Sequence, residues 1–466
     1  MNLIKKLATW EGILKPKDIK GEMPSNKAIY RRTFDIAWPS ALENVLIALI
    51  GAIDMIMVGS LGKEAISAVG ICNQPKFLCL SPIFALNIAV VVFVARRKGA
   101  NLKKEANDYM RLALIFSSII SVIVCVISFI YSKEILIFAG AQKDYLELAN
   151  SYYRIIILSI IPYSIGLTMT SAQRGAGYTK ISLITNLTAN FINIIFNALL
   201  INGLFGFPKL GVIGAALATA LGNVISFIIA IISLLQKNKY LSLNFEKITN
   251  IKNKIKDILK VGSNAFIEQI FLRFGFFMYA KVVANLGTAE FAAHQICMNI
   301  MTISFGFGDG LQVANTSLVG QSLGAKRTDL AIVQTRFTQL IGFMIAFVLL
   351  IAIISFNSQI LSLFTNDLRV IELAKIPIII LSITILFQIP QVIIVGCLRG
   401  AGDVKFVAWM MLVCVGIIRP ILSYILAYPL GFGLIGAWIG LFLDQLMRFT
   451  LSLLRFITRK WLTINL

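Results

Sequence analysis

The chain has few charged residues, few acids among them and a single imidazole. Only 14% of its 466 residues are charged, against roughly a quarter in soluble domains, which excludes an ordinary soluble fold. One histidine, His294, and six cysteines without a Cys-x-x-Cys spacing argue against a zinc or haem centre and against a disulfide framework. The same scarcity provides no nucleophile with its base, and no metal cluster, for a membrane-embedded enzyme.

Hydrophobic residues dominate instead, at 58% of the chain with a mean hydropathy of +0.84. This composition predicts an all-α integral membrane protein, and twelve apolar stretches are each near the ~20 residues that a membrane-spanning helix needs. We place the spans at 34–59, 67–94, 112–131, 152–172, 182–203, 211–235, 261–285, 292–319, 337–356, 372–396, 406–427 and 433–454.

Basic residues outnumber acidic ones by 43 to 22, but they lie in short loops between the apolar runs, so we expect no nucleic-acid partner. With a cytoplasmic amino terminus, the inside segments hold about 31 of them and the outside loops about six. This predicts a multi-pass protein of the cytoplasmic (inner) membrane with both termini in the cytoplasm. We expect no cleaved signal peptide, because the first thirty residues lack an apolar run.

Within these thirty residues, Leu3, Leu7, Trp10 and Leu14 recur at helical spacing. They indicate either a short helix at the membrane interface or a solvated basic tail.

The sequence repeats itself 225 positions later. Glu43 recurs as Glu268, and Arg174, Gly175 and Gly177 recur as Arg399, Gly400 and Gly402. Six spans in each repeat predict two parallel lobes related by an axis along the membrane normal, with a central cavity between them. The expected parts are a cytoplasmic segment 1–32, an N-lobe 33–236, a cytoplasmic linker 237–260, a C-lobe 261–456 and a cytoplasmic tail 457–466.

Asp54 is the strongest single candidate for an ion-binding residue, because it lies among apolar neighbours in the first span with no base within a turn or two. A carboxyl in such surroundings is suited to exchange a proton or bind a monovalent cation such as Na⁺. Asn186, Asn190, Asn193 and Asn197 lie on one face of the fifth span and are its expected partners. The alternative is that they only hydrogen-bond neighbouring helices.

In the second repeat, Tyr279 stands opposite Asp54 and Arg419 opposite Asn197. A fixed positive charge would repel a cation, so the cation site is expected in the first lobe. Asp444 and Arg448 are spaced as a structural i to i+4 ion pair.

Three other acids lie within spans. Glu43 and Glu268 occupy equivalent places and either attract organic cations in the cavity or brace contacts between the lobes. Arg273 or Lys281 could neutralise Glu268. Asp309, between Gly308 and Gly310 in an interrupted span, either faces the cavity or caps a break.

Several motifs resemble those of the multidrug and toxic compound extrusion (MATE) transporters from about Arg32 to Arg455. They are Asp54–Gly59 (DMIMVG), Gln173–Lys180 (QRGAGYTK), Leu398–Asp403 (LRGAGD), Ala292–Ile296 (AAHQI) and Leu318–Ala325 (LVGQSLGA). The resemblance implies a carrier that exchanges cationic amphipathic drugs or metabolites for inward Na⁺ or H⁺. We expect it to work as a monomer among membrane lipids, without a cofactor.

The resemblance also assigns residues. Asp54 and Asn193 match, whereas Asn197 replaces the fifth-span acid of one branch of the family and Gln388 the tenth-span acid of the other. Gln388 and its neighbour Gln391 are therefore added to the expected cavity, and the ion stays open.

A lipid-linked precursor flippase of the same superfamily is the alternative, but it would favour a basic cavity. A channel is a further alternative, although no filter sequence is visible.

Overall fold

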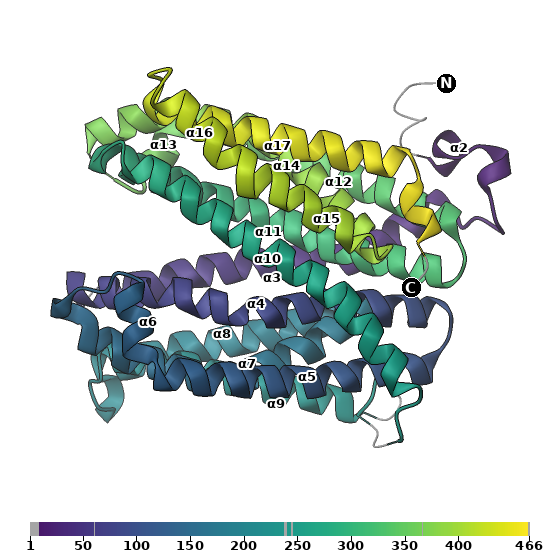
Figure 1. The fold of residues 1–466 in the computed structure, drawn as a ribbon, viewed down its shortest axis with the longest axis horizontal. Helices are drawn as coiled ribbons and strands as arrows, with labels where there is room; N and C mark the ends of the chain where they lie inside the picture. Colours follow the sequence, from purple (N-terminus) through teal and green to yellow (C-terminus); the bar gives the residue numbers. More distant parts are fainter. Residues whose placement is uncertain (1–8, 60, 237–239, 244–245, 366, 465–466) are drawn as a thin grey trace. The chain divides into compact units, whose positions relative to one another are not determined.

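A computed structural model describes residues 9–59, 61–236, 240–243, 246–365 and 367–464. These residues form helices and connecting turns, without a β-strand among them (Figure 1). The helices are α2 (Trp10–Ile13), α3 (Asn26–Gly59), α4 (Lys63–Gly99), α5 (Lys103–Ile130), α6 (Ser132–Phe138), α7 (Lys143–Gly175), α8 (Thr179–Asn202), α9 (Val212–Leu235), α10 (Ile251–Ala284), α11 (Thr288–Gly324), α12 (Thr328–Ser355), α13 (Asn357–Ser362), α14 (Leu368–Gly400), α15 (Val404–Met411), a π-helical segment (Leu412–Ile418), α16 (Arg419–Ala427) and α17 (Gly433–Ile457).

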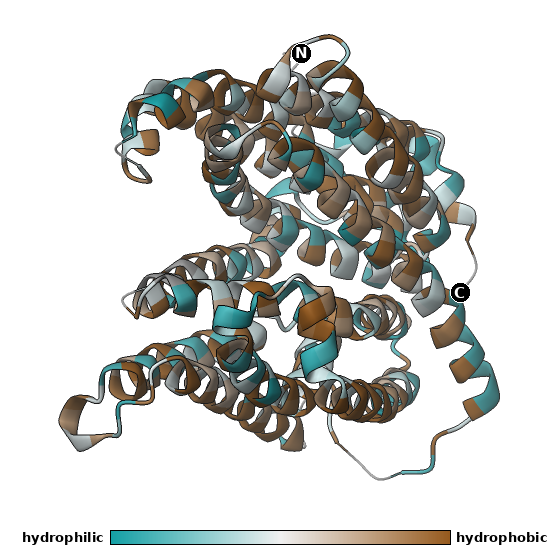
Figure 2. Cartoon of the chain, turned by 60° about the vertical axis from the view of Figure 1, so that its left-hand side comes forward, coloured by the Kyte–Doolittle hydropathy of each residue, from teal (hydrophilic) through white to brown (hydrophobic). Residues whose placement is uncertain are grey.

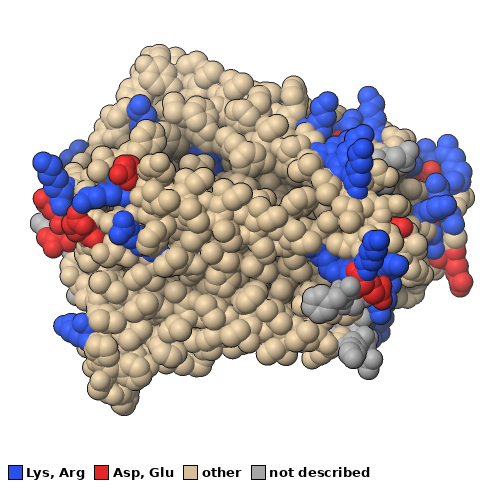
Figure 3. Space-filling view, turned by 60° about the horizontal axis from the view of Figure 1, so that its bottom comes forward, with Lys and Arg blue, Asp and Glu red and all other residues tan. Residues whose placement is uncertain are grey.

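The predicted all-α membrane fold is confirmed. Ten helices in the described ranges are long and apolar enough to cross a membrane, with α15, the π-helical segment and α16 counted as one. The other two predicted spans are α10 and α11, with 34 and 37 residues. Hydrophobic residues predominate along the helices (Figure 2), and on the face in Figure 3 most charged side chains gather at the left and right, with few between.

The sequence repeat is also a structural repeat. Helix α3 begins at Asn26 and α10 at Ile251, while α7 begins at Lys143 and α14 at Leu368, each 225 positions apart. Their contacts repeat as well, because α7 packs on α4, α5 and α9, as α14 does on α11, α12 and α17.

The chain divides into two compact units. Unit 1 comprises Met1–Asn44 and Ile267–Leu466, and unit 2 comprises Val45–Phe266. The predicted lobes follow the sequence repeat, whereas the units are defined by contacts. The first part of α3, up to Asn44, therefore belongs to the unit that holds most of the second repeat, and the first part of α10, up to Phe266, to the unit that holds most of the first. The lobe boundaries stay a prediction.

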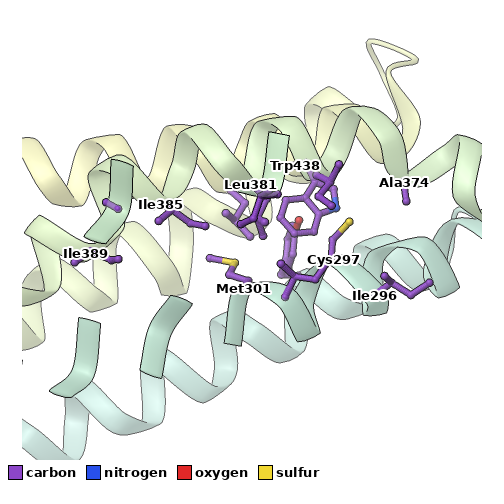
Figure 4. Close-up of a cluster of buried hydrophobic side chains, with 14 of the residues drawn as sticks. Ile296, Cys297, Met301, Ala374, Leu381, Ile385, Ile389 and Trp438 are labelled. Carbon is purple, nitrogen blue, oxygen red and sulfur yellow. The ribbon is translucent and has the colours of Figure 1, made fainter. Parts of the chain in front are cut away.

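Unit 1 has a core between α11, α14 and α17. Met301 and Cys297 of α11 face Leu381 and Ile385 of α14, and Trp438 of α17 closes the cluster (Figure 4). Burial of these large apolar side chains, each worth about 1.5–3 kcal/mol, fixes the faces that the helices turn inward.

The described part of the amino-terminal segment packs on other parts of unit 1, and its place relative to the membrane stays a prediction. Trp10 and Leu14 pack in unit 1 with Trp461 near the carboxyl terminus, and Asp18 pairs with Arg459 at 3.1 Å. The segment is therefore folded onto protein, because its apolar side chains find a protein surface. Leu3 and Leu7 lie outside the described residues.

Candidate ion and substrate sites

Asp54 lies in unit 2, five residues before the end of α3 and hence ~8 Å from that end. Its half-buried carboxylate accepts a 2.8 Å hydrogen bond from Asn197 Nδ2 of α8. Asn193, one turn earlier on the same face, is buried beside it. The predicted meeting of the first and fifth spans is therefore present in this structure.

The amide of Asn193 has one orientation that satisfies both its nitrogen and its oxygen. In that orientation Nδ2 donates to Asp54 Oδ1 at 2.9 Å and Oδ2 at 3.1 Å, while the oxygen accepts from the Thr219 backbone N–H at 3.1 Å. Two amides from α8 thus hold one carboxylate, and Thr219 of α9 fixes one of them. Asn197 Oδ1 is buried without a hydrogen-bond partner in the described chain.

The other predicted asparagines do not reach this carboxylate. Asn190 is half-buried and makes no hydrogen bond to a described residue, and Asn186 lies a further turn away on α8. Of the four asparagines on this face of α8, only Asn193 and Asn197 therefore contact Asp54.

Lys76 is a member of the site that sequence reasoning missed. It lies 13 residues into α4, half-buried, and its ammonium interacts electrostatically with Asp54. Among the described residues it forms no ion pair. A lone base inside the predicted span 67–94 was a visible signal of the same kind as Asp54.

At the corresponding place in unit 1, the positive charge predicted at Arg419 has a counter-charge that the sequence did not indicate. Arg419 is 1% exposed and donates from Nε and Nη2 to Asp444 Oδ2, at 2.9 and 2.6 Å. Arg448 donates to the same oxygen at 3.0 Å, which confirms the expected i to i+4 pair. Tyr279 is packed in the hydrophobic core with His294 and Trp438. Protein side chains therefore fill this place. Asp444 is close to Arg419 in space and provides its counter-charge.

Glu268 has a partner that the sequence did not indicate. Arg399, in the last turn of α14, donates from Nη2 to Glu268 Oε1, and the glutamate is 0% exposed. Neither Arg273 nor Lys281 takes this place. Glu43, its repeat equivalent, is also buried. Both glutamates are thus enclosed, and Glu268 is already neutralised within unit 1.

Asp309 is the one predicted cavity residue whose side chain is exposed. Helix α11 runs unbroken through it, so the predicted interruption is wrong: Gly308 packs near Val392, and Gly310 leaves space for Ala41. The Arg399 guanidinium acts on Asp309 electrostatically.

The two glutamines of α14 are buried. Gln391 accepts from Gln445 at 3.3 Å and so joins the network of Arg448 and Asp444. Gln388 is 1% exposed, and neither its amide oxygen nor its nitrogen finds a hydrogen-bond partner within the described chain.

The paired loop motifs build identical helix ends. Gly177 and Gly402 have φ of +82° and +85° and donate to the carbonyls of Arg174 and Arg399, each at 2.8 Å. A left-handed residue after the helix is the usual glycine position. Gly175 and Gly400 instead allow close packing, since a Cβ would lie 2.8 Å from the Val91 carbonyl oxygen and 2.5 Å from that of Thr316.

No group of three or more His, Cys, Asp or Glu side chains that could hold a metal ion occurs in the described ranges. The site chemistry is therefore that of single carboxylates with amides and bases.

These features define a helical membrane protein of two repeats, with a carboxylate–amide site in only one of them. The MatE family model matches residues 39–199 and 265–425. The chain is 28% identical over 444 residues to a probable multidrug resistance protein NorM of Thermotoga maritima, with 95% of this chain and 94% of that protein covered. It is 31% identical over 422 residues to a probable NorM of Bacillus cereus, with 88% and 92% covered.

Solved structures share the fold. An outward-facing MATE family multidrug resistance transporter of the MOP superfamily gives a TM-score of 0.87 at 20% identity, with 97% of this chain and 98% of that chain covered. A MOP superfamily transporter from Pyrococcus furiosus gives 0.86 at 20% identity, with 100% and 99% covered. The chain belongs to the MATE family of multidrug efflux transporters, whose members are transporters and not enzymes. The flippase alternative is not favoured.

Proposed function

We propose that the protein exports cationic amphipathic drugs or metabolites in exchange for inward H⁺ or Na⁺ by alternating access, with Asp54 as the coupling carboxylate. The observation that carries this proposal is the contact of Asp54 of α3 with Asn197 and Asn193 of α8, between two helices that are long and apolar enough to cross a membrane. An intramembrane carboxylate with polar partners is costly to keep, and such groups usually serve an ion pathway. The printed names of the NorM relatives support the drug-efflux part.

The orientation of the two amides bears on the ion. Both turn N–H groups towards Asp54, which suits a carboxylate that is charged until it takes up a proton. Sodium would need oxygen ligands, and of the two amides that contact Asp54, Asn197 has an oxygen without a hydrogen-bond partner among the described residues. The contacts favour H⁺, and Na⁺ is kept as the second candidate.

For the substrate, the exposed Asp309 is the best-supported anionic contact, ahead of Glu43, Glu268, Gln388 and Gln391. Its charge is available to a bound cation, whereas Glu268 is neutralised by Arg399. The 32 phenylalanines and 13 methionines of the chain provide ample material for an adaptable lining.

The proposed setting is the cytoplasmic membrane, with both termini in the cytoplasm and the protein working as a monomer among lipids without a cofactor. The pairing of Asp18 with Arg459 supports termini on one side, and the distribution of basic residues supports the cytoplasm as that side.

Ethidium export from proteoliposomes, with the H⁺ and Na⁺ gradients imposed separately, tests the proposal. We expect one gradient to drive export, Asp54→Asn to abolish the driven component, and Asp309→Asn to raise KM while coupling is retained. Glu147→Gln, at an exposed carboxylate of α7, is the matched control and is expected to behave as wild type. If neither gradient moves ethidium, or if Asp54→Asn is driven normally, the proposal is wrong.

A further inference from the structure

A groove in unit 2 is separate from the Asp54 site. It has a volume of about 660 Å³ and lies between α4, α5 and the first sixteen residues of α10, from Ile251 to Phe266. Its size falls in the range of ~300–1,000 Å³ that is typical of small-molecule sites.

The lining is polarised along its length. Lys252, Lys256 and Lys260 line it at intervals of four residues, so they share one face of α10. All three are exposed, and none forms an ion pair with a residue that the structure describes. Three unneutralised ammonium groups at one groove favour an anion and repel the cationic compounds that the transporter is proposed to carry.

The remainder of the lining is almost entirely apolar. Leu86 of α4, Phe116 and Ile120 of α5 and Leu259 of α10 contribute, and Leu259 is 58% exposed. From Lys252 to Phe266 the lining follows ~21 Å of helix, at ~1.5 Å per residue. The three lysines are spread over the first ~12 Å of this stretch, and the remaining ~9 Å, up to Phe266, is lined without a charged side chain.

We propose that this groove binds an anionic phospholipid of the cytoplasmic leaflet, with its phosphate at Lys252, Lys256 and Lys260 and an acyl chain along the apolar lining. Basic pockets between membrane helices on the cytoplasmic side are suited to such headgroups. A soluble phosphate would satisfy the lysines but leave the apolar surface uncovered. The side of the membrane rests on the topology proposed above, whereas the groove itself does not depend on ion coupling.

Gly262 provides a way to fill the groove without disturbing the packing. It lines the groove, and a Cβ built on it meets no atom within 4 Å. A leucine at this position therefore occupies the space of the acyl chain and also favours the helix. Gly70 of α4 likewise has nothing within 4 Å, but it does not line the groove, so Gly70→Leu is the matched control.

Native mass spectrometry of the full-length protein in detergent, titrated with dioleoyl phosphatidylglycerol or dioleoyl phosphatidylcholine, tests the proposal. We expect one phosphatidylglycerol to bind at least tenfold more tightly than phosphatidylcholine. The triple variant K252Q/K256Q/K260Q should lose this preference, and Gly262→Leu should weaken phosphatidylglycerol binding. K103Q/K104Q/K180Q, which removes three exposed lysines elsewhere in unit 2, and Gly70→Leu should bind it as wild type does.

Three results would overturn the proposal. Equal binding of the two lipids, or a K252Q/K256Q/K260Q triple that retains the preference, would show that the lysines do not select a headgroup. Displacement of the lipid by glycerol 3-phosphate at equal concentration would show a soluble-anion site without a chain. Ethidium transport by the same variants separates this test from the proposed function, since a lipid site can fail while transport persists.

Discussion

Neutralising Glu268 alone is expected to destabilise the protein, because it leaves Arg399 without its counter-charge inside unit 1. The side chains of Glu268 and Arg399 are only 1% and 14% exposed, so water can do little to replace either partner. Breaking a buried pair by removing one member costs about 3–5 kcal/mol. Glu268 Oε2 and Arg399 Nε have no hydrogen-bond partners in the described chain, so we expect the lower end, about 3 kcal/mol, for Glu268→Gln and for Arg399→Gln.

The double variant E268Q/R399Q removes both charges together. Replacing both members of a buried pair is often nearly neutral, so we expect a loss of about 1 kcal/mol or less. The two single losses would then exceed the double loss by several kcal/mol, and a coupling of even 2 kcal/mol changes the folded-to-unfolded ratio about 30-fold. Reversible unfolding of the three variants in mixed detergent micelles measures this cycle.

Transport by the same proteins separates a Glu268 that only pairs with Arg399 from one that binds the organic cation. If the glutamate serves only Arg399, the stable double variant exports ethidium as wild type does. If Glu268 itself binds the organic cation, the double variant is stable but has a raised KM. Additive single losses, without recovery in the double variant, would refute the argument from the ion pair.

Four further predictions follow from other contacts. Asp108→Asn should lower the free energy of unfolding by about 3–5 kcal/mol, because buried Asp108 binds Lys254, Arg111 and Thr249. It should also speed hydrogen exchange in 246–254, whereas Asp144→Asn, at an exposed aspartate, is the control and should not. Gly400→Ala should cost about 1–3 kcal/mol in thermal unfolding through the clash with Thr316, whereas Gly262→Ala should not destabilise. Lys76→Gln should change the pH profile of driven ethidium export, because Asp54 loses the electrostatic effect of the Lys76 ammonium; an unchanged profile would exclude Lys76 from the site. The hydrogen bond from Arg459 holds the pKa of Asp18 below its usual 3.8, so the stability from this pair is present above that pH and is lost as pH falls below it. Hydrogen exchange in 9–19 should therefore rise at low pH, and an unchanged exchange rate would show that the pair does not hold this segment.

Much of the helical scaffold could be predicted, because its signal is local. The predicted span 433–454 corresponds to Gly433–Ile457, and the span 182–203 to Thr179–Asn202. The short helices α6 and α13 were missed, since seven and six residues give too little periodicity to detect. The π-helical segment was missed as well, since Pro420 just beyond its end marks a place where the helix can bend but does not reveal its hydrogen-bond pattern.

The candidate sites were predictable only where the repeat or a helical face carried the signal. Asn193 and Asn197 were found because their spacing places both on the face that meets Asp54. The partners of Glu268 and Arg419 were missed because Arg399 and Asp444 are brought to them by tertiary packing, at sequence separations of 131 and 25 residues. Nothing in the linear pattern distinguishes an arginine that neutralises a buried acid from one that remains free.

The two repeats differ at equivalent places in a way that supports the proposal of an ion site in the first repeat. In unit 2 the hydrogen-bond partners of the one carboxylate are neutral amides, and the Lys76 ammonium acts on it only electrostatically, so the carboxylate can take up H⁺ or Na⁺ in the proposed function. In unit 1 two arginines already share one aspartate, so a further cation would join an excess of positive charge. The two repeats thus have the same helix ends at Gly177 and Gly402 but different charged side chains at equivalent places within their spans. Introducing Arg419→Asn alone should not create a second ion site, because Tyr279 and Trp438 leave that place packed with hydrophobic side chains.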